Sequence, residues 1–176
     1  MEIESDMSAR LPWPASAAEP DWDAVYAAQL PRVYNYFRYR FGNDVLAEDL
    51  TSRTFEKAWR ARHRYRSDLA GFATWLLRIA RNVGIDHLRA HREHALLDEE
   101  AEPAGEGTPE DERSRESDLE RLAALVARLP VREQELVALK YGAEATNRAI
   151  ARVTGLSESN VGTILHRVVQ SLRREW

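Results

Sequence analysis

Apolar side chains recur at three- and four-residue steps through most of this chain, and that spacing is typical of amphipathic α-helices. The pattern predicts an all-α protein with two groups of helices. The first group covers residues 22–42, 43–62 and 72–92. The second group covers residues 116–129, 130–142, 145–155 and 156–175.

Each predicted helix of the first group carries one apolar stripe. The helix at 22–42 has Pro31 in its middle, which predicts a bend or a restart, and Gly42-Asn43 marks its end. In the helix at 72–92, Arg78, Arg81, Arg89 and Arg92 lie opposite the apolar stripe, and Ile85 and Leu88 interrupt this basic side. The predicted stripes are Trp22, Val25, Tyr26, Leu30, Val33, Tyr34, Phe37 and Phe41; then Leu46, Leu50, Phe55, Ala58 and Trp59; then Phe72, Leu76, Ile79 and Val83, with Trp75 at the edge.

A basic segment, RARHRYRS at residues 60–67, precedes the third predicted helix and enters the polar loop 63–71. It holds four arginines, one histidine and one tyrosine. Cations attract phosphates, and a tyrosine among them can stack on an unpaired base. The segment therefore indicates a nucleic-acid contact, with a solvated basic loop as the alternative.

The second group contains the spacing of a helix-turn-helix. Thr146 and Ser157 are candidate N-caps, and Gly155 permits the tight turn between the last two helices. The last helix would bury Val161, Ile164 or Leu165, Val168 and Leu172. Its other side carries Ser159, Thr163, His166, Arg167, Gln170 and Arg173. Short polar groups followed by cations favour a reader of the DNA major groove, and a plain helical hairpin with a solvated face is the alternative. In the predicted helix at 116–129, the apolar face consists of Leu119, Leu122, Val126 and Leu129.

Charge divides the chain more sharply than its net value of −4 suggests. Residues 22–97 hold 13 basic and 8 acidic side chains, and residues 98–120 hold 2 basic and 11 acidic ones. The acidic stretch has little to bury and predicts a linker, whose 23 residues extend at most about 75 Å. The predicted organisation is a disordered tail at 1–21, helical domains at 22–97 and 118–176, and a flexible acidic linker at 98–117.

Several classes of function find no support in the sequence. Cysteine is absent, which excludes disulfides and thiolate chemistry, and the carboxylates gather in the predicted linker, where nothing would hold them for catalysis. We therefore expect no enzyme, no cofactor and no metal, although His87, His91 and His94 share roughly one helical face. No signal peptide and no membrane-spanning run are predicted.

Three segments together resemble bacterial extracytoplasmic-function (ECF) sigma factors of the sigma-70 family. They are AEDLTSRTFEKAWRA (47–61), FATWLLRIARNVGIDHLRAHR (72–92) and the stretch from LPVREQELVALKYG (129–142) through AIARVTGLSESNVGTILHRVVQSLRR (149–174). The chain departs from the usual family pattern at Ser52-Arg53, where Gln-Glu is common, and at Gly162 and Ile164, where a Lys and an Arg are common.

The resemblance implies a division of labour between the two domains. The first would be the family's region 2, which binds the β′ clamp of core RNA polymerase and melts the −10 promoter element. The second would be region 4, which binds the β flap and reads the −35 element. The implied polymerase contacts are Asp49, Leu50, Arg53, Thr54 and Phe55; the −10 contacts are Arg64, Tyr65, Arg66, Trp75, Arg78, Arg81, Asn82 and Arg89; the −35 contacts are Ser157, Ser159, Asn160, Thr163, His166, Arg167 and Gln170.

The predicted function is thus a cytoplasmic sigma factor that directs core polymerase to promoter DNA, with an anti-sigma factor as a further partner and no stable membrane insertion. Tyr65 would hold a base that has left the duplex. Two readings remain as alternatives. One is a helix-turn-helix DNA-binding regulator that does not join polymerase, and the other is a sigma-like interaction module.

Overall fold

The computed structural model describes residues 22–97 and 115–176, and within these ranges it contains helices and no strands, so the all-α prediction is confirmed. The predicted tail and most of the predicted linker lie outside the described residues. The helices are α1 (Trp22–Phe41), α2 (Asp44–Ala61), η1 (Arg62–Arg64), α3 (Phe72–Leu97), α4 (Arg115–Ala127), α5 (Val131–Val137), η2 (Ala138–Gly142), α6 (Asn147–Thr154) and α7 (Glu158–Glu175).

Polar caps begin three of these helices. The side chain of Asn43 accepts a hydrogen bond from the Leu46 amide at 2.8 Å and starts α2. Thr146 and Ser157, both predicted as caps, accept hydrogen bonds from the backbone amides of Ala149 and Asn160. Gly155 ends α6 with a φ of +80°, the left-handed conformation that glycine adopts without strain. The sequence therefore positions α7 as expected.

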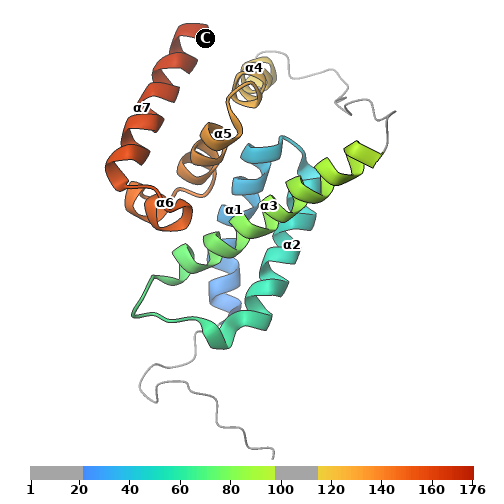
Figure 1. The fold of residues 1–176 in the computed structure, drawn as a ribbon, viewed down its shortest axis with the longest axis vertical. Coiled ribbons are helices and arrows are strands. Elements are labelled where there is room, and N and C mark those ends of the chain that lie inside the picture. Colours follow the sequence, from blue (N-terminus) through green and yellow to red (C-terminus); the bar gives the residue numbers. More distant parts are fainter. Residues whose placement is uncertain (1–21, 98–114) are drawn as a thin grey trace, which may run out of the picture.

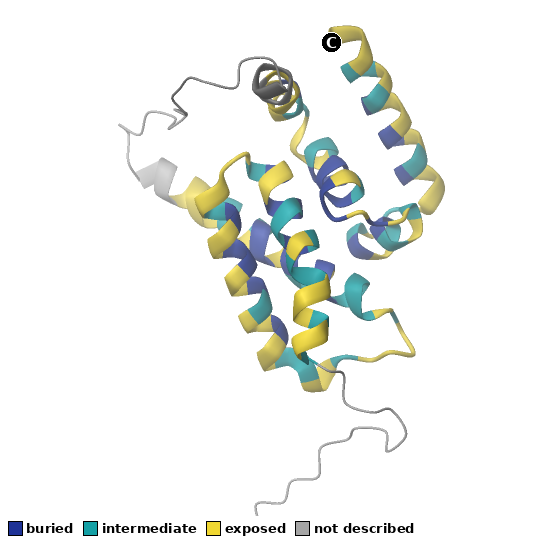
Figure 2. Ribbon diagram, turned by 180° about the vertical axis from the view of Figure 1, so that it is seen from behind, coloured by how far each residue is buried: buried dark blue, intermediate teal, exposed yellow. Residues whose placement is uncertain are grey.

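The helices form two modules that pack against each other (Figure 1). The first module consists of α1, α2, η1 and α3, with α3 crossing the other two helices. The second module consists of α4, α5, η2, α6 and α7, with α7 outermost. Across the boundary, η2 and α5 pack on α1, and α6 packs on α3. One continuous cluster of buried side chains contains residues of both modules (Figure 2).

The structure refines three predictions about individual helices. α1 continues through Pro31 as one helix, so of the bend or restart predicted at the proline, the restart is absent. Of the apolar face predicted at 116–129, Val126 and Leu129 pack on the core, whereas Leu122 is exposed and Leu125, which was not predicted, is buried. The side chain of Leu119 lies outside the described residues. The helix predicted at 130–142 is α-helical only to Val137 and then widens into the π-helical turn η2, where the Ala143 amide bonds to the Ala138 carbonyl at 3.0 Å.

The packing of the modules explains why α1 buries more than its predicted stripe. Tyr36 and Arg40 were not predicted in the core, yet both are buried. They face the second module, in which Glu135 accepts a hydrogen bond from Arg40 at 2.6 Å. Within α1, Arg40 also donates a hydrogen bond to the Tyr36 hydroxyl. A single amphipathic stripe predicts one covered face, and α1 has two.

We expect the stability of this boundary to fall at alkaline pH. Burial raises the pKa of Tyr36 from its ordinary value of 10.0 to about 12. The folded protein therefore holds this proton more tightly than the unfolded chain, so the stabilisation is complete below pH 10 and is lost as the pH rises toward 12. Urea unfolding between pH 9 and 12 should show this loss, and Tyr36→Phe should flatten the slope. An unchanged slope in Tyr36→Phe would contradict it.

Candidate nucleic-acid interface

An aromatic cluster in the first module surrounds the predicted base-binding residue. The Tyr65 ring lies 5.3 Å from the Phe72 ring and 5.4 Å from the Trp75 ring, measured between centroids. The Trp22 ring lies 5.5 Å from the Phe72 ring. Tyr65 is half-buried, and burial raises its pKa, so its hydroxyl is neutral at pH 7. The Tyr65 ring is thus held against two other rings and stays partly exposed, as stacking on a base requires.

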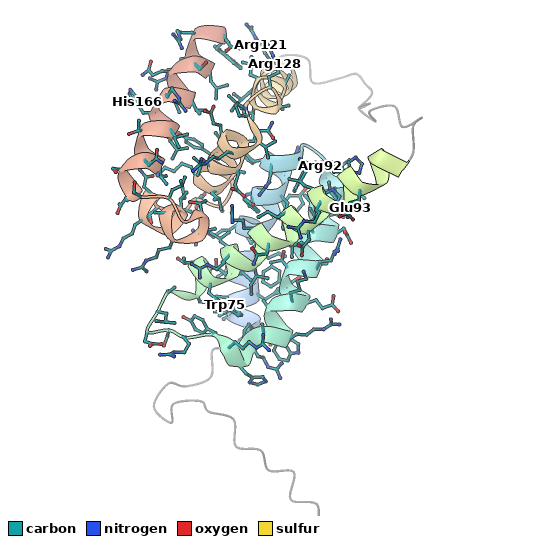
Figure 3. All side chains as sticks on the ribbon, in the orientation of Figure 1. Trp75, Arg92, Glu93, Arg121, Arg128 and His166 are labelled. Carbon is teal, nitrogen blue, oxygen red and sulfur yellow. The ribbon has the colours of Figure 1, made fainter. Side chains whose placement is uncertain are left out.

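Exposed arginines flank Tyr65 in the loop. Arg64 and Arg66 are both exposed, and Arg66 forms a two-bond pair with Asp68 at 3.0 and 2.6 Å. At α3, Asn82 and Arg89 are exposed, and Trp75 lies near the start of the helix (Figure 3). The predicted −10 residues are thus spread along one loop and one helix of the same module.

Two of the predicted −10 arginines are already engaged by the second module. Arg78 donates a hydrogen bond to the backbone carbonyl of Arg152 in α6 at 2.7 Å. Arg81 bonds to both carboxylate oxygens of Glu135 in α5, at 3.1 and 3.3 Å. Glu135 also holds Arg40 and is itself buried, so one carboxylate joins two arginines of the first module.

The residues that interrupt the basic side of α3 line a groove between the modules. Ile85 and Leu88 face Val131 and Leu156 across a cavity of about 620 Å³. The charged part of its lining comes from both modules and consists of Arg40, Arg81, Arg89, Arg92 and Arg132 together with Glu93 and Glu135. Arg92 and Glu93 mark this stretch of α3 in Figure 3. Ile85 and Leu88 are therefore half-buried where a solvent-facing side would have left them exposed.

The predicted −35 residues form one exposed face of α7. All seven are exposed: Ser157, Ser159, Asn160, Thr163, His166, Arg167 and Gln170. Val161, Ile164, Leu165 and Val168 are buried beneath them, so both Ile164 and Leu165 contribute to the core. Arg167 bonds to Glu133 of α5 at 2.9 Å, and His166 projects from the outer side of the helix (Figure 3). The face is open to a large ligand.

The predicted polymerase contacts divide into exposed and buried residues. Asp49 and Arg53 are exposed on α2, and the Arg53 Nη1 atom lies 3.6 Å from the Asp49 Oδ2 atom. The Phe55 ring packs against the Tyr26 ring, with centroids 4.5 Å apart. Leu50 and Thr54 are fully buried, and the Thr54 hydroxyl donates to the Leu50 carbonyl. In this conformation their side chains belong to the core and are out of a partner's reach.

This burial gives a stability prediction for Leu50→Ala. Removing a fully buried leucine leaves a cavity, and we expect the free energy of unfolding to fall by about 2–5 kcal/mol, measured by urea denaturation. Leu69→Ala is the matched control, because Leu69 is exposed. Equal stability of the two variants would place Leu50 on the surface instead.

The structure describes the side chains of two of the three histidines that share one helical face in the sequence. His87 and His91 lie side by side on α3, with ring centroids 6.1 Å apart, while the side chain of His94 lies outside the described residues. Burial lowers the pKa of His87, which packs against Phe41 at 5.4 Å. Within the described part of the chain, no group of three or more His, Cys, Asp or Glu side chains is arranged to hold a metal ion.

Sequence reasoning missed the contacts between the modules. Tyr36, Arg40 and Glu135 form a buried polar cluster, and Gly142 approaches the backbone of α1. The one available signal was the pair Ile85 and Leu88, whose position on a basic helix side indicated a covering element.

Among the described helices, none is both long enough and apolar enough to span a membrane.

Comparison with known proteins identifies both modules. Residues 25–94 match the model of sigma-70 region 2, and residues 119–172 match that of sigma-70 region 4. The chain is 33% identical to the ECF RNA polymerase sigma factor BldN of Streptomyces coelicolor over 91% of its own length, and it spans 62% of the length of that relative. It is 30% identical to the RNA polymerase sigma factor CarQ of Myxococcus xanthus, with 89% of each chain covered.

A solved structure has the same fold. It is the sigma factor RpoE of Bartonella quintana in complex with the anti-sigma factor NepR, and the TM-score is 0.75 at 17% identity, over 88% of this chain and 95% of that one. The order of the two matched regions, the arrangement of the helices and the 30% identity to CarQ all point to the same family. The chain therefore belongs to the sigma-70 family, as an ECF-type RNA polymerase sigma factor.

Proposed function

We propose that the first module, over residues 22–97, captures an unpaired base of the −10 element, and that Tyr65 is the side chain that stacks on it. The observation that supports this most is the support of Tyr65 by Phe72 and Trp75 within a basic loop. Unstacking a base costs a few kcal/mol, and stacking on an aromatic ring returns about 1–3 kcal/mol. A pre-positioned ring thus shifts the equilibrium from duplex toward an open bubble.

The second module, over residues 118–176, reads the −35 element with the exposed face of α7. Its polar groups near the N-terminus, Ser159, Asn160 and Thr163, are short enough to let the helix enter a major groove. His166, Arg167 and Gln170 follow one or two turns later and reach the groove edges or the phosphates. The predicted linker of 98–117 connects the two readers, and α4 begins within it at Arg115.

Core polymerase is the partner that brings both modules to one promoter. Asp49, Arg53 and Phe55 are the accessible candidates on α2 for the β′ clamp, and the second module takes the β flap. The role includes no covalent chemistry by this chain, and it is carried out in the cytoplasm, where polymerase meets the chromosome. An anti-sigma factor is a further partner, as it is for the similarly folded sigma factor bound to NepR.

Binding to DNA with and without polymerase tests this function against a free-standing DNA-binding regulator. A randomised promoter library is incubated with the chain, with core polymerase, or with both, and the bound DNA is sequenced. We expect enrichment of paired −35 and −10 sequences only when both proteins are present. Equal enrichment by the chain alone would favour the regulator. Asp49→Arg, which reverses an exposed charge on α2, should weaken the joint complex and leave the helical content unchanged.

A further inference from the structure

A second aromatic surface lies next to the Tyr65 cluster, and it carries a guanidinium on its ring. Trp59, near the end of α2, is 49% exposed. The Arg62 guanidinium carbon lies 4.1 Å from the centroid of the Trp59 ring, and the Arg62 Nη1 atom donates a hydrogen bond to the Trp59 backbone carbonyl at 2.8 Å. These two contacts hold the guanidinium over the ring. Arg62 is only half-buried, so part of it stays open to a ligand.

The charge of Arg62 is available to such a ligand. Two neighbouring arginines are paired, because Arg60 bonds to Glu56 and Arg66 bonds to Asp68, both at 2.6 Å. Within residues 22–97 and 115–176, Arg62 forms no ion pair with a carboxylate. Its hydrogen bond to the carbonyl uses one of the five N–H groups of a guanidinium. Arg62 therefore keeps donors and charge for a phosphate, and a flat face for a base.

One row of four rings joins this surface to Tyr65. Successive ring centroids lie 5.3 Å apart from Tyr65 to Phe72, 5.5 Å apart from Phe72 to Trp22, and 5.4 Å apart from Trp22 to Trp59. A DNA strand advances about 3.4 Å per nucleotide while its bases stay stacked, and further when they separate. The two ends of the row are therefore spaced for two bases of one strand that lie no more than about four nucleotides apart.

We propose that Arg62, held on Trp59, is a second stacking site for an unpaired base, on the same DNA strand as the base that Tyr65 holds. The inference rests on the proposed function of Tyr65. Unpaired bases stack on guanidinium planes as well as on aromatic rings, and such stacking tolerates any base. The charge of Arg62 also attracts the neighbouring phosphate. Two fixed bases oppose re-pairing of the strand more than one does, and they set its path across the first module.

The first measurement locates the stacked bases in the complete complex. Polymerase holoenzyme with the full chain is bound to a template whose −10 region is already open, and 2-aminopurine replaces each base of that region in turn. The fluorescence of 2-aminopurine falls when it stacks. Tyr65→Ala should raise the fluorescence at one position, and Arg62→Ala should raise it at a different position within about four nucleotides. If Arg62→Ala alters no position, or only the Tyr65 position, the proposal is overturned.

Two further substitutions separate stacking from charge. Arg62→Lys keeps the cation but loses the flat guanidinium, so it should raise the fluorescence at the same position as Arg62→Ala does. Arg60→Ala is the matched control, because it removes a nearby cation that is already paired with Glu56, and it should leave every position unchanged. Parental fluorescence in Arg62→Lys, or an equal rise in Arg60→Ala, would show that Arg62 acts by charge alone and refute the stacking.

The second measurement is the binding of the same holoenzyme to the opened template across a salt series. Losing one contact to a single-strand phosphate should make the plot of log K against log salt concentration shallower by about 0.7 in Arg62→Ala. Arg62→Lys should keep the parental slope, because it keeps the charge. An unchanged slope in Arg62→Ala would remove the phosphate contact from the proposal.

The pair of variants also separates this inference from the proposed function. If Tyr65→Ala raises the fluorescence at one position and Arg62→Ala raises none, the second site is wrong and the role of Tyr65 stands. If Arg62→Ala raises the fluorescence and Tyr65→Ala does not, the Arg62 site stands and base capture by Tyr65 fails. Circular dichroism should show the parental helical content in both variants, since both side chains are only half-buried.

Discussion

Tyr65→Ala should lower specific run-off transcription by about 10- to 100-fold, because the stacking lost with the ring is worth about 1–3 kcal/mol. The substituted position is half-buried against Phe72 and Trp75, so the fold should survive the truncation. Tyr65→Phe keeps the ring and should retain most of the activity. The measurement is the amount of run-off product with core polymerase on a promoter selected from a randomised library.

A template with a pre-opened bubble at the −10 element distinguishes melting from other steps. If Tyr65 acts by stabilising the open strand, the bubble should restore much of the activity of Tyr65→Ala. Leu69→Ala, an exposed position in the same loop, should resemble the parent on both templates. A Tyr65→Ala defect that is equal on closed and pre-opened templates would remove Tyr65 from the melting step.

Thr163→Glu should weaken binding to the −35 element by about 10- to 100-fold, the range expected when a groove contact of 1–3 kcal/mol is lost. Thr163 is exposed in the middle of the polar face of α7, and its hydroxyl bonds only to the Ser159 carbonyl at 3.0 Å among the described contacts. A carboxylate there meets the negative potential of DNA. Glutamate also favours helix more than threonine does, so α7 should remain folded.

Ala124→Glu is the matched control for the added charge. Ala124 is exposed on α4 and is not among the predicted −35 residues, and Ala124→Glu adds the same single negative charge. Binding of polymerase holoenzyme to duplexes with an intact or a scrambled −35 element provides the measurement. If the two variants weaken binding equally, or if scrambling leaves the Thr163→Glu defect unchanged in size, α7 is not the −35 reader.

The sequence predicts those parts of the fold that depend on local chemistry. Thr146 and Ser157 stand where a polar side chain can cap a helix, and Gly155 stands where the chain must turn in the left-handed region. The apolar face of α7 follows from its three- and four-residue spacing. The candidate −35 residues therefore share one exposed face, as the pattern indicates, although their contact with DNA stays a prediction.

Contacts between distant segments were beyond the sequence pattern. Arg40 is buried against Glu135, about a hundred residues later, and Arg40 in turn donates a hydrogen bond to the buried Tyr36 hydroxyl. Periodicity within α1 carries no sign of this. Leu50 is buried, as the apolar stripe predicted for the second helix indicates, and Thr54, which that stripe did not include, is buried beside it. Pro31 is tolerated within α1 because a proline costs the helix one hydrogen bond without preventing its continuation.

The most direct test of the proposed function is run-off transcription by core polymerase on a randomised promoter library, with and without the purified chain. We expect discrete transcripts only when the chain is present, from templates that share a −35 and a −10 sequence about two helical turns apart, roughly 70 Å. The yield should fall for Tyr65→Ala and for Thr163→Glu. A chain that binds DNA but neither joins core polymerase nor changes its transcripts would contradict the assignment.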